Sequence, residues 1–277
     1  MSLKLAGIKR QSDYSPNHIE NDTLILLKTA EELKSLGAAV KIYNEESILN
    51  NHLDADFIFS MAQGPQAQQE LLKVENEGAC IINSPKGVMN CYRVNMVKKF
   101  QDNGIPFPKS IIVKTGELCT IRLKDFDSEK IWLKRGDVHA VHREDVTVAY
   151  SEEEKNNLIN EFSKRKIKQA VLQEHIEGDL IKFYALRDSD FFYWYQIIGK
   201  PPIKFNLNEL KELARISAEI LGLYVYGGDA IISDNEKITV IDINDWPSFA
   251  PIRDKASKQI AQLIFNKAKA GERESLC

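Results

Sequence analysis

The chain is poor in cysteine and has no long hydrophobic run. Its 277 residues include four cysteines, which are scattered and form no C-x-x-C pair. This pattern argues against a disulfide framework or a zinc site, and it favours a reducing compartment. No apolar run approaches the roughly 20 residues that cross a bilayer, and the first residues lack the apolar core and cleavage site of a signal peptide. We therefore expect a cytoplasmic protein with no membrane partner.

Neither sign of charge is in excess. The 37 basic residues (Lys and Arg) and 40 acidic residues (Asp and Glu) give a net charge of −3 at pH 7. This balance does not predict a nucleic-acid partner or an anionic membrane surface. The 43% hydrophobic and 28% charged content is that of a globular protein. The length suits one large domain or two to three small ones.

Strand and helix patterns alternate along the first 86 residues. Helical spacing predicts one helix from Ser15 and Pro16 to Gly37, and a second over 66–78. The strand-like segments around them are 5–9, 39–43, 56–62 and 80–84. Such alternation is typical of a parallel sheet with helices on both faces. No G-x-G-x-x-G occurs, so we expect a small Rossmann-like domain without a dinucleotide fingerprint.

The pattern changes after residue 86. One helix is predicted over 85–103, and another over 151–166, where Ser151 and Glu154 form a capping box. Further strand candidates are 110–114, 130–135, 171–176, 180–187, 191–197, 228–233 and 237–243, with a helix at 207–222. This part of the chain therefore predicts a mixed sheet of α+β type. The last residues, 267–277, predict a frayed tail.

The segment VIDINDWPS carries polar side chains where a strand would carry apolar ones. Asp242 and Asn244 are two residues apart, so they face the same side of a strand. Asp229 opens the preceding strand, and the turn-like DNEK between the strands predicts a hairpin with Asp229 opposite Asp242. Three oxygen donors on one face suit magnesium, which takes its other ligands from water and phosphate. A buried polar network is the alternative that these residues leave open.

Other motifs occur in a fixed order around this hairpin. They are NSP before the helix of Arg93, GIPFP after it, IWLK ending at Lys134, VLQEHIEGD, and GGDAIIS with VIDINDWPS. In this order they resemble the ATP-grasp superfamily, and its carboxylate–amine ligases in particular, over residues 82–252. The resemblance implies an ATP-grasp fold in three parts. These are a Rossmann-like pre-ATP-grasp domain over 1–86, a linker helix and lid subdomain over 87–170, and a nucleotide- and metal-binding subdomain over 171–277.

The resemblance also implies ATP and Mg²⁺ as cofactors and assigns roles to single residues. The ATP site would comprise Arg93, Lys134, Glu174, Ile176, Asp179 and Lys182. The Mg²⁺ ligands would be Asp229, Asp242 and Asn244. The catalytic groups would be Arg93, Lys134, Lys182, Arg253 and His139. In this arrangement the cations neutralise the phosphates, because a polyanion needs fixed positive charges around it.

Several departures from the ligase pattern keep the reaction open. Arg93 stands where the family usually has lysine, and the loop after Lys134 has one glycine in place of a glycine-rich lid. Asp242 stands in place of the usual glutamate. The order D-I-N, aromatic residue, proline is similar to the ATP-grasp inositol polyphosphate kinases, as is His139, five residues after Lys134.

The leading expectation is an ATP-dependent ligase. It would join a small-molecule carboxylate to an amine through an acyl phosphate and release ADP and phosphate. A kinase that phosphorylates a hydroxyl, and a non-catalytic ATP-binding regulator, are the alternatives. A homodimer is compatible with the resemblance.

Overall fold

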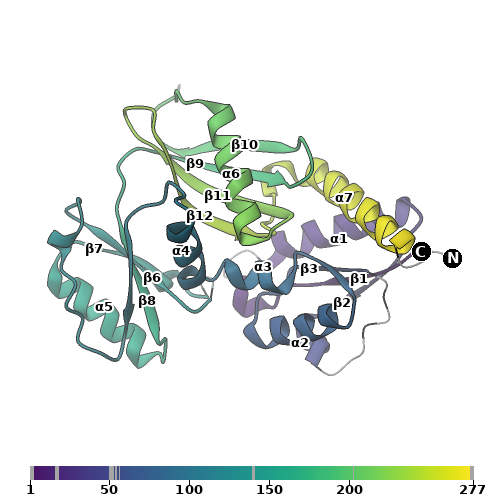
Figure 1. Cartoon of the computed structure of the whole chain (residues 1–277), viewed down its shortest axis with the longest axis horizontal. Coiled ribbons are helices and arrows are strands. Elements are labelled where there is room, and N and C mark those ends of the chain that lie inside the picture. The colour runs from purple at the N-terminus through teal and green to yellow at the C-terminus, as the bar shows by residue number, and fades with distance from the viewer. Residues whose placement is uncertain are drawn as a thin grey trace.

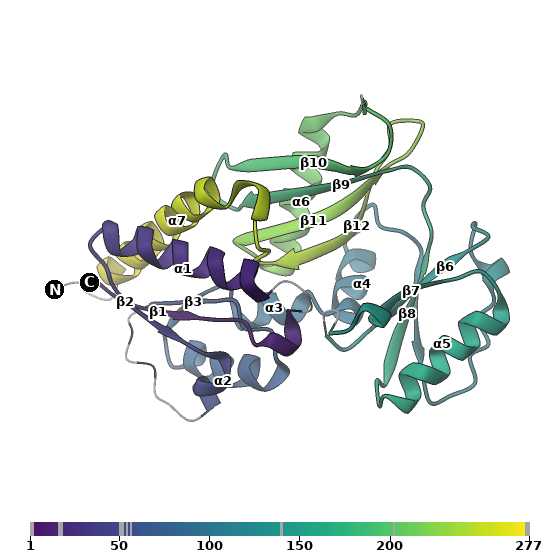
Figure 2. The same ribbon diagram turned by 180° about the vertical axis from the view of Figure 1, so that it is seen from behind.

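The computed structural model describes residues 3–15, 19–49, 53, 55, 57–138, 141–201 and 203–274, with side chains through residue 270. The strands of this described part form three four-stranded sheets (Figure 1). One sheet belongs to the N-terminal part of the chain, one to the predicted lid, and one lies between them in space (Figures 1 and 2). The predicted class, α/β combined with α+β, is confirmed.

The N-terminal sheet is parallel. Its strands, in spatial order, are β2 (Ala39–Tyr43), β1 (Lys4–Ile8), β3 (Phe57–Ser60) and β4 (Cys80–Ile82). Helix α1 (Ile19–Ser35) covers one face and α2 (Pro65–Asn76) covers the other. The predicted Rossmann-like layering is therefore present. The predicted start of the first helix at Pro16 lies outside the described residues.

Helix α7 (Arg253–Glu274) lies beside α1 on the same face of the N-terminal sheet (Figure 2). Its buried residues Ala256, Ile260 and Ile264 belong to one apolar cluster with Leu26 and Phe59. The expected frayed tail over 267–277 is therefore wrong at least through Glu274, because the buried Ala268 continues the four-residue spacing of these apolar side chains on one face of the helix. The last helix of the chain therefore packs in the same hydrophobic core as its first strands.

The helix predicted over 85–103 is two helices, α3 (Pro85–Asn90) and α4 (Arg93–Asp102). The Ser84 hydroxyl caps α3 by accepting a hydrogen bond from the Gly87 N–H at 3.0 Å. Tyr92 then has an extended backbone, and its hydroxyl donates to the Gln63 carbonyl at 2.8 Å. This break makes Arg93 the first residue of α4.

The lid sheet is antiparallel. Its strands, in spatial order, are β5 (Ser110–Lys114), β8 (Gln169–Glu174), β6 (Ile131–Arg135) and β7 (Val146–Ala149). Helix α5 (Glu152–Lys164) packs Ile159 and Phe162 against one face. Of its predicted capping box, the serine half is confirmed, because the Ser151 hydroxyl accepts from the Glu154 N–H at 3.1 Å. The Glu154 carboxylate accepts from the Tyr150 N–H at 2.7 Å instead of the Ser151 N–H. The other face meets α4.

The central sheet is also antiparallel. Its strands, in spatial order, are β10 (Phe192–Ile198), β9 (Asp179–Leu186), β11 (Val225–Ile232) and β12 (Ile238–Asp245). Helices α6 (Leu207–Leu221) and α4 cover one face, and the N-terminal part with α7 covers the other. The expectation of a single mixed sheet is therefore wrong. The residues 175–178 separate two antiparallel sheets, and β7 completes the first of them. None of the described helices is both long and apolar enough to span a bilayer.

Candidate active site

The predicted metal hairpin is formed by β11 and β12. The antiparallel register pairs Asp229 with Asp242, as the sequence predicts, and it also pairs Gly227 with Asn244, with an irregularity between Asp229 and Ala230. Asp242 and Asn244 project from the same face of β12. Among the described residues, no group of three or more His, Cys, Asp or Glu could hold a metal. A site at this hairpin would therefore use two carboxylates and the Asn244 amide oxygen, a donor set that suits Mg²⁺.

Three cations from three elements surround the two carboxylates. The Lys182 ammonium, on β9, lies 2.8 Å from the Asp229 carboxylate. The Arg93 guanidinium, at the start of α4, lies 3.2 Å from Asp242. Lys134, at the end of β6, donates to the Ile241 carbonyl at 3.4 Å. The lid, the linker helix and the central sheet each contribute one positive charge to the same place.

Burial shifts the pKa of several of these groups. It raises the pKa of the Asp229 carboxyl, against the opposing effect of Lys182. Burial, together with the neighbouring Arg93, lowers the pKa of Lys134 to about 8. For Lys182 burial also disfavours the charge, but the Asp229 carboxylate outweighs it and the pKa of Lys182 is raised. Lys134 therefore holds its proton more weakly than an ordinary lysine, and an anion beside it would raise its pKa again.

Two hollows of the structure are lined by residues of this charge cluster, and a third lies at the hinge. Arg93, Lys134 and Asp242 line a cavity of only about 10 Å³ between the lid sheet and the central sheet. A hollow of about 640 Å³ lies at the hinge and is lined by the predicted adenine contacts, Glu174 and Ile176. The third cavity, of about 360 Å³, lies between the N-terminal sheet and the central sheet.

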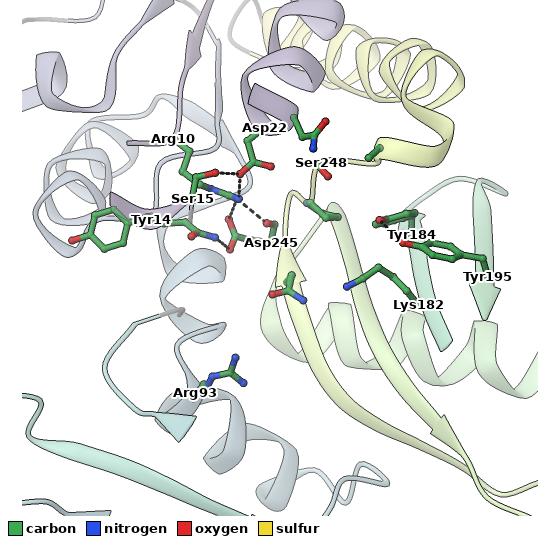
Figure 3. Close-up of a pocket in the computed structure, with 15 residues that line it drawn as sticks. Arg10, Tyr14, Ser15, Asp22, Arg93, Lys182, Tyr184, Tyr195, Asp245 and Ser248 are labelled. Carbon is green, nitrogen blue, oxygen red and sulfur yellow. Dashed lines mark hydrogen bonds and ion pairs between the residues drawn. The ribbon is translucent and has the colours of Figure 1, made fainter. Parts of the chain in front are cut away.

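The 360 Å³ cavity has a different lining on its two sides (Figure 3). Lys182, Tyr184 and Tyr195 project into it from the central sheet, and the two tyrosine hydroxyl oxygens lie 3.3 Å apart. Arg10 and Asp22 line it from the N-terminal side. Asn244 and Arg93 also line it, so this cavity adjoins the charge cluster.

Two of the residues predicted to bind the nucleoside make other contacts. The Glu174 carboxylate accepts from the Asp127 N–H at 2.7 Å. Its neighbour Gln173 is 2% exposed and lines the small cavity with Lys134. Successive side chains of a strand face opposite sides, so Gln173 on β8 faces the 10 Å³ cavity and Glu174 faces away from it. Asp179 lies against Gly199, where a Cβ on the glycine would come within 1.5 Å of the Asp179 carboxylate oxygen.

Arg253 begins α7, and one of its Nη atoms donates to the Asn21 Oδ1 at 2.5 Å. Asn21 lines the 360 Å³ cavity, so Arg253 lies behind the wall of that cavity. His139 lies outside the described residues. The binding and catalytic roles of all the predicted residues stay predictions.

The sequence reasoning missed a buried polar network beside the hairpin. It joins Arg10, Gln63 and Asp245, and Asp245 is only 1% exposed. Arg10 and Gln63 follow β1 and β3 by two or three residues. The carboxyl ends of parallel strands are the usual place for binding residues, and this rule is the signal that could have found them.

Comparisons with known proteins show the fold. No family model matches the sequence, and no curated protein matches it. The structure is similar to the D-alanine–D-alanine ligase from Bacillus anthracis complexed with ATP (TM-score 0.74, 12% identity, covering 99% of this chain and 100% of that one). It is also similar to that ligase from Coxiella burnetii (TM-score 0.74, 13% identity, covering 100% and 99%).

A third similar structure is the VanG D-Ala:D-Ser ligase from Enterococcus faecalis (TM-score 0.68, 13% identity, covering 90% and 92%). The protein therefore has the fold of the ATP-grasp carboxylate–amine ligases over its whole length, and the resemblance seen in the motifs is confirmed at the level of the fold.

Proposed function

We propose that this protein is an ATP-dependent ligase that joins a small-molecule carboxylate to an amine through an acyl phosphate. The observation that carries the proposal is the arrangement of Asp229, Asp242 and Asn244 opposite three cations, where the lid meets the central sheet. The same fold in the Bacillus anthracis structure belongs to a D-alanine–D-alanine ligase complexed with ATP. Because ATP is a cytoplasmic metabolite, we also infer a cytoplasmic location.

The residues of the hairpin fit a magnesium–nucleotide complex. Both carboxylates and the amide oxygen are hard oxygen donors, and Mg²⁺ bound there would neutralise charge on the phosphates. The Nε of Arg93 is buried and has no hydrogen-bond partner among the described residues. A buried donor without an acceptor is unfavourable, so a phosphate oxygen would satisfy it. Lys134 would hold a second phosphate, which would raise its pKa again.

The side chains around the 360 Å³ cavity would orient the reacting groups. A carboxylate oxygen of the first substrate attacks the γ-phosphorus, and ADP leaves. The nitrogen of the amine then attacks the carbonyl carbon of the acyl phosphate, and phosphate leaves. Lys182, which faces this cavity, would stabilise the charge on the transferring group. Positioning and electrostatic stabilisation are sufficient for such a reaction, so no protein nucleophile is required.

A small-molecule kinase is the second candidate. It is favoured by Asp242 and Asn244 in the order D-I-N, followed by an aromatic residue and proline. In that case a hydroxyl oxygen of a substrate in the same cavity attacks the γ-phosphorus and loses its proton, ADP leaves, and the phosphorylated alcohol is the product.

A trapping assay distinguishes these reactions. The protein is incubated with Mg-ATP, hydroxylamine and pooled metabolites, and ADP and hydroxamates are followed by mass spectrometry. A ligase gives ADP with a hydroxamate, whose mass identifies the acid. ADP with a phosphorylated alcohol and no hydroxamate supports the kinase and contradicts the ligase. Nucleotide binding without turnover across the panel supports a non-catalytic regulator.

A further inference from the structure

The turn that follows Asn244 has a strained backbone. Trp246 and Phe249 have φ angles of +35° and +49°, in the left-handed region that residues other than glycine rarely adopt. Both side chains are fully buried. Such a conformation costs about 1–3 kcal/mol for each residue and persists only where the surroundings impose it. The turn from Asp245 to Phe249 must therefore be held by contacts from elsewhere in the chain.

Arg10 supplies two of these contacts from the N-terminal sheet (Figure 3). One Nη atom of Arg10 donates to the Asp245 carbonyl at 3.2 Å and to the Trp246 carbonyl at 3.1 Å. The other Nη donates to the Asp22 carboxylate at 2.8 Å, and Nε donates to the Met61 carbonyl at 3.1 Å. The guanidinium thus fixes the turn relative to β3 and α1 at the same time.

Gln63 contacts the Asp245 side chain in the same turn. Its amide nitrogen donates to the Asp245 carboxylate at 2.8 Å. The Trp246 N–H donates to the Val225 carbonyl at 3.0 Å, which ties the turn to β11. Both the backbone and the side chain of Asp245 are therefore held by residues that follow β1 and β3.

Arg10 lines the 360 Å³ cavity, but it is poorly placed to bind a substrate. Its side chain is only 8% exposed, and all three of its nitrogens donate to groups of the protein. Its charge is balanced by Asp22 at 2.8 Å and by Asp245 at 3.8 Å. A ligand anion would have to displace these partners, so contacts within the protein account for Arg10 without a ligand.

We propose that Arg10 and Gln63 are positioning residues for the metal hairpin. By holding the strained turn they fix the end of β12, and with it Asn244, at the geometry that a metal ion requires. The proposal rests on the proposed function, because it assumes that Asp229, Asp242 and Asn244 bind the metal. Groups that orient metal ligands change metal affinity by about 10- to 100-fold when they are removed.

The test measures binding of Mn²⁺ in the presence of ATP, by the electron paramagnetic resonance signal of free Mn²⁺. The Arg10→Met and Gln63→Leu variants should bind Mn²⁺ about 10- to 100-fold more weakly than the wild type. Arg10→Lys retains the charge and a donor, so it should recover part of the affinity. If Arg10→Met does not fold, Gln63→Leu alone carries the test, because Gln63 contributes no charge to the network.

Asp22→Asn is the matched control. It removes a buried partner of Arg10 but leaves the donors that Arg10 directs at the Asp245 and Trp246 carbonyls. This variant should lower the thermal midpoint as Arg10→Lys does, yet keep the Mn²⁺ affinity within about threefold of the wild type.

The outcomes separate the two proposals. Wild-type protein that binds no Mn²⁺ with ATP overturns the proposed function and the positioning role together. Wild-type binding with unchanged affinity in folded Gln63→Leu, and in Arg10→Met where it folds, overturns the positioning role alone. Equal loss of affinity in Asp22→Asn means a general effect on stability and also overturns it.

Discussion

At the level of single residues, two positively charged groups compete for the Asp242 carboxylate. In this structure it pairs with Arg93, which is 7% exposed, whereas the proposed function requires it to bind a metal ion. A nucleotide would resolve this competition by offering phosphate oxygens to Arg93 and leaving the carboxylate to the metal. Exchange of this kind leaves no buried charge without a partner, which would otherwise cost several kcal/mol.

Replacement of Asp242 tests this competition directly. Asp242→Asn should lower the rate of ADP formation by at least about 100-fold. It should also lower the free energy of unfolding by about 1–3 kcal/mol, because Arg93 loses a buried charged partner. The two quantities are measured by coupled assay and urea titration. Asp234→Asn changes an exposed acid in the turn of the same hairpin, so it should match the wild type in both. Full activity in Asp242→Asn would remove the metal assignment.

The lowered pKa of Lys134 predicts a specific dependence of stability on pH. The folded protein holds this proton with a pKa of about 8, below the ordinary 10.5. Between these values the unfolded chain binds more protons, so the contribution of Lys134 to stability rises with pH. Lys134→Met should therefore be about 1–3 kcal/mol more stable than the wild type at pH 7.5. This gain should shrink as the pH approaches 10.5.

Urea unfolding of both proteins at several pH values measures the difference. A gain that does not depend on pH would mean that Lys134 keeps its proton on folding. Addition of Mg-ATP at pH 7.5 should reverse the order of stability, because only the wild type gains the contact between ammonium and phosphate.

The sequence predicts some site residues better than others, for a physical reason. The hairpin that brings Asp229 opposite Asp242 is predicted by a short turn between two strand patterns, which are local properties, although the register passes through an irregularity between Asp229 and Ala230. The contact of Arg10 with Asp245 joins residues 235 positions apart. No local pattern encodes such a contact, so it requires the packing of the N-terminal sheet against the central sheet.

At the level of elements, the hinge between the lid and the central sheet depends on one glycine. Gly178 has a φ of +148°, and a Cβ there would lie 2.3 Å from the Ile232 carbonyl oxygen. The residue links β8 to β9, so its backbone sets the angle between two sheets whose facing sides carry the charge cluster. Any side chain at this position must push the hinge away from β11.

Gly178→Ala should therefore lower the free energy of unfolding by about 2–4 kcal/mol. It should also weaken binding of ATP, because the lid would close at a different angle. Urea unfolding and calorimetric titration measure these effects. Gly116→Ala is the control, since a Cβ on this exposed lid glycine meets nothing within 4 Å. Wild-type stability and affinity in Gly178→Ala would show that the hinge tolerates a different backbone.

Most elements were predictable from periodicity, and the failures have local causes. β7 is a four-residue strand, VTVA, that follows a polar loop, so its pattern is too short to recognise. The break between α3 and α4 contains no proline or glycine. It arises because the extended backbone of Tyr92 is stabilised by a contact with Gln63, 29 residues earlier in the chain.

At the level of the whole molecule, α7 joins the two ends of the chain in one core. Ile260 and Ile264 of α7 are fully buried against α1 and the N-terminal sheet. Tyr184 and Val225 of the central sheet belong to the same cluster. The N-terminal sheet is therefore stabilised by residues from the end of the sequence, and a fragment of residues 1–86 would expose an apolar face.

Truncation of one α7 side chain should destabilise mainly segments that are far from α7 in the sequence. Ile264→Ala should lower the free energy of unfolding by about 2–4 kcal/mol. Hydrogen exchange should become faster in β1, β2 and α1, and change little in the lid strands. Gln262→Ala, on the exposed side of α7, is the matched control. Faster exchange spread evenly over the lid and the N-terminal sheet would contradict this packing.

The position of α7 has a consequence for folding during synthesis on the ribosome. The strands β1–β4 are complete at Ile82, but α7, which shares one of their faces with α1, begins only at Arg253. At translation rates of about 5–20 residues per second, this gap lasts roughly 10–30 s. During that time α1 alone covers its face of the sheet, and the apolar surface that α7 buries stays exposed. We expect chaperones that bind nascent chains to occupy that surface until α7 has been synthesised and displaces them.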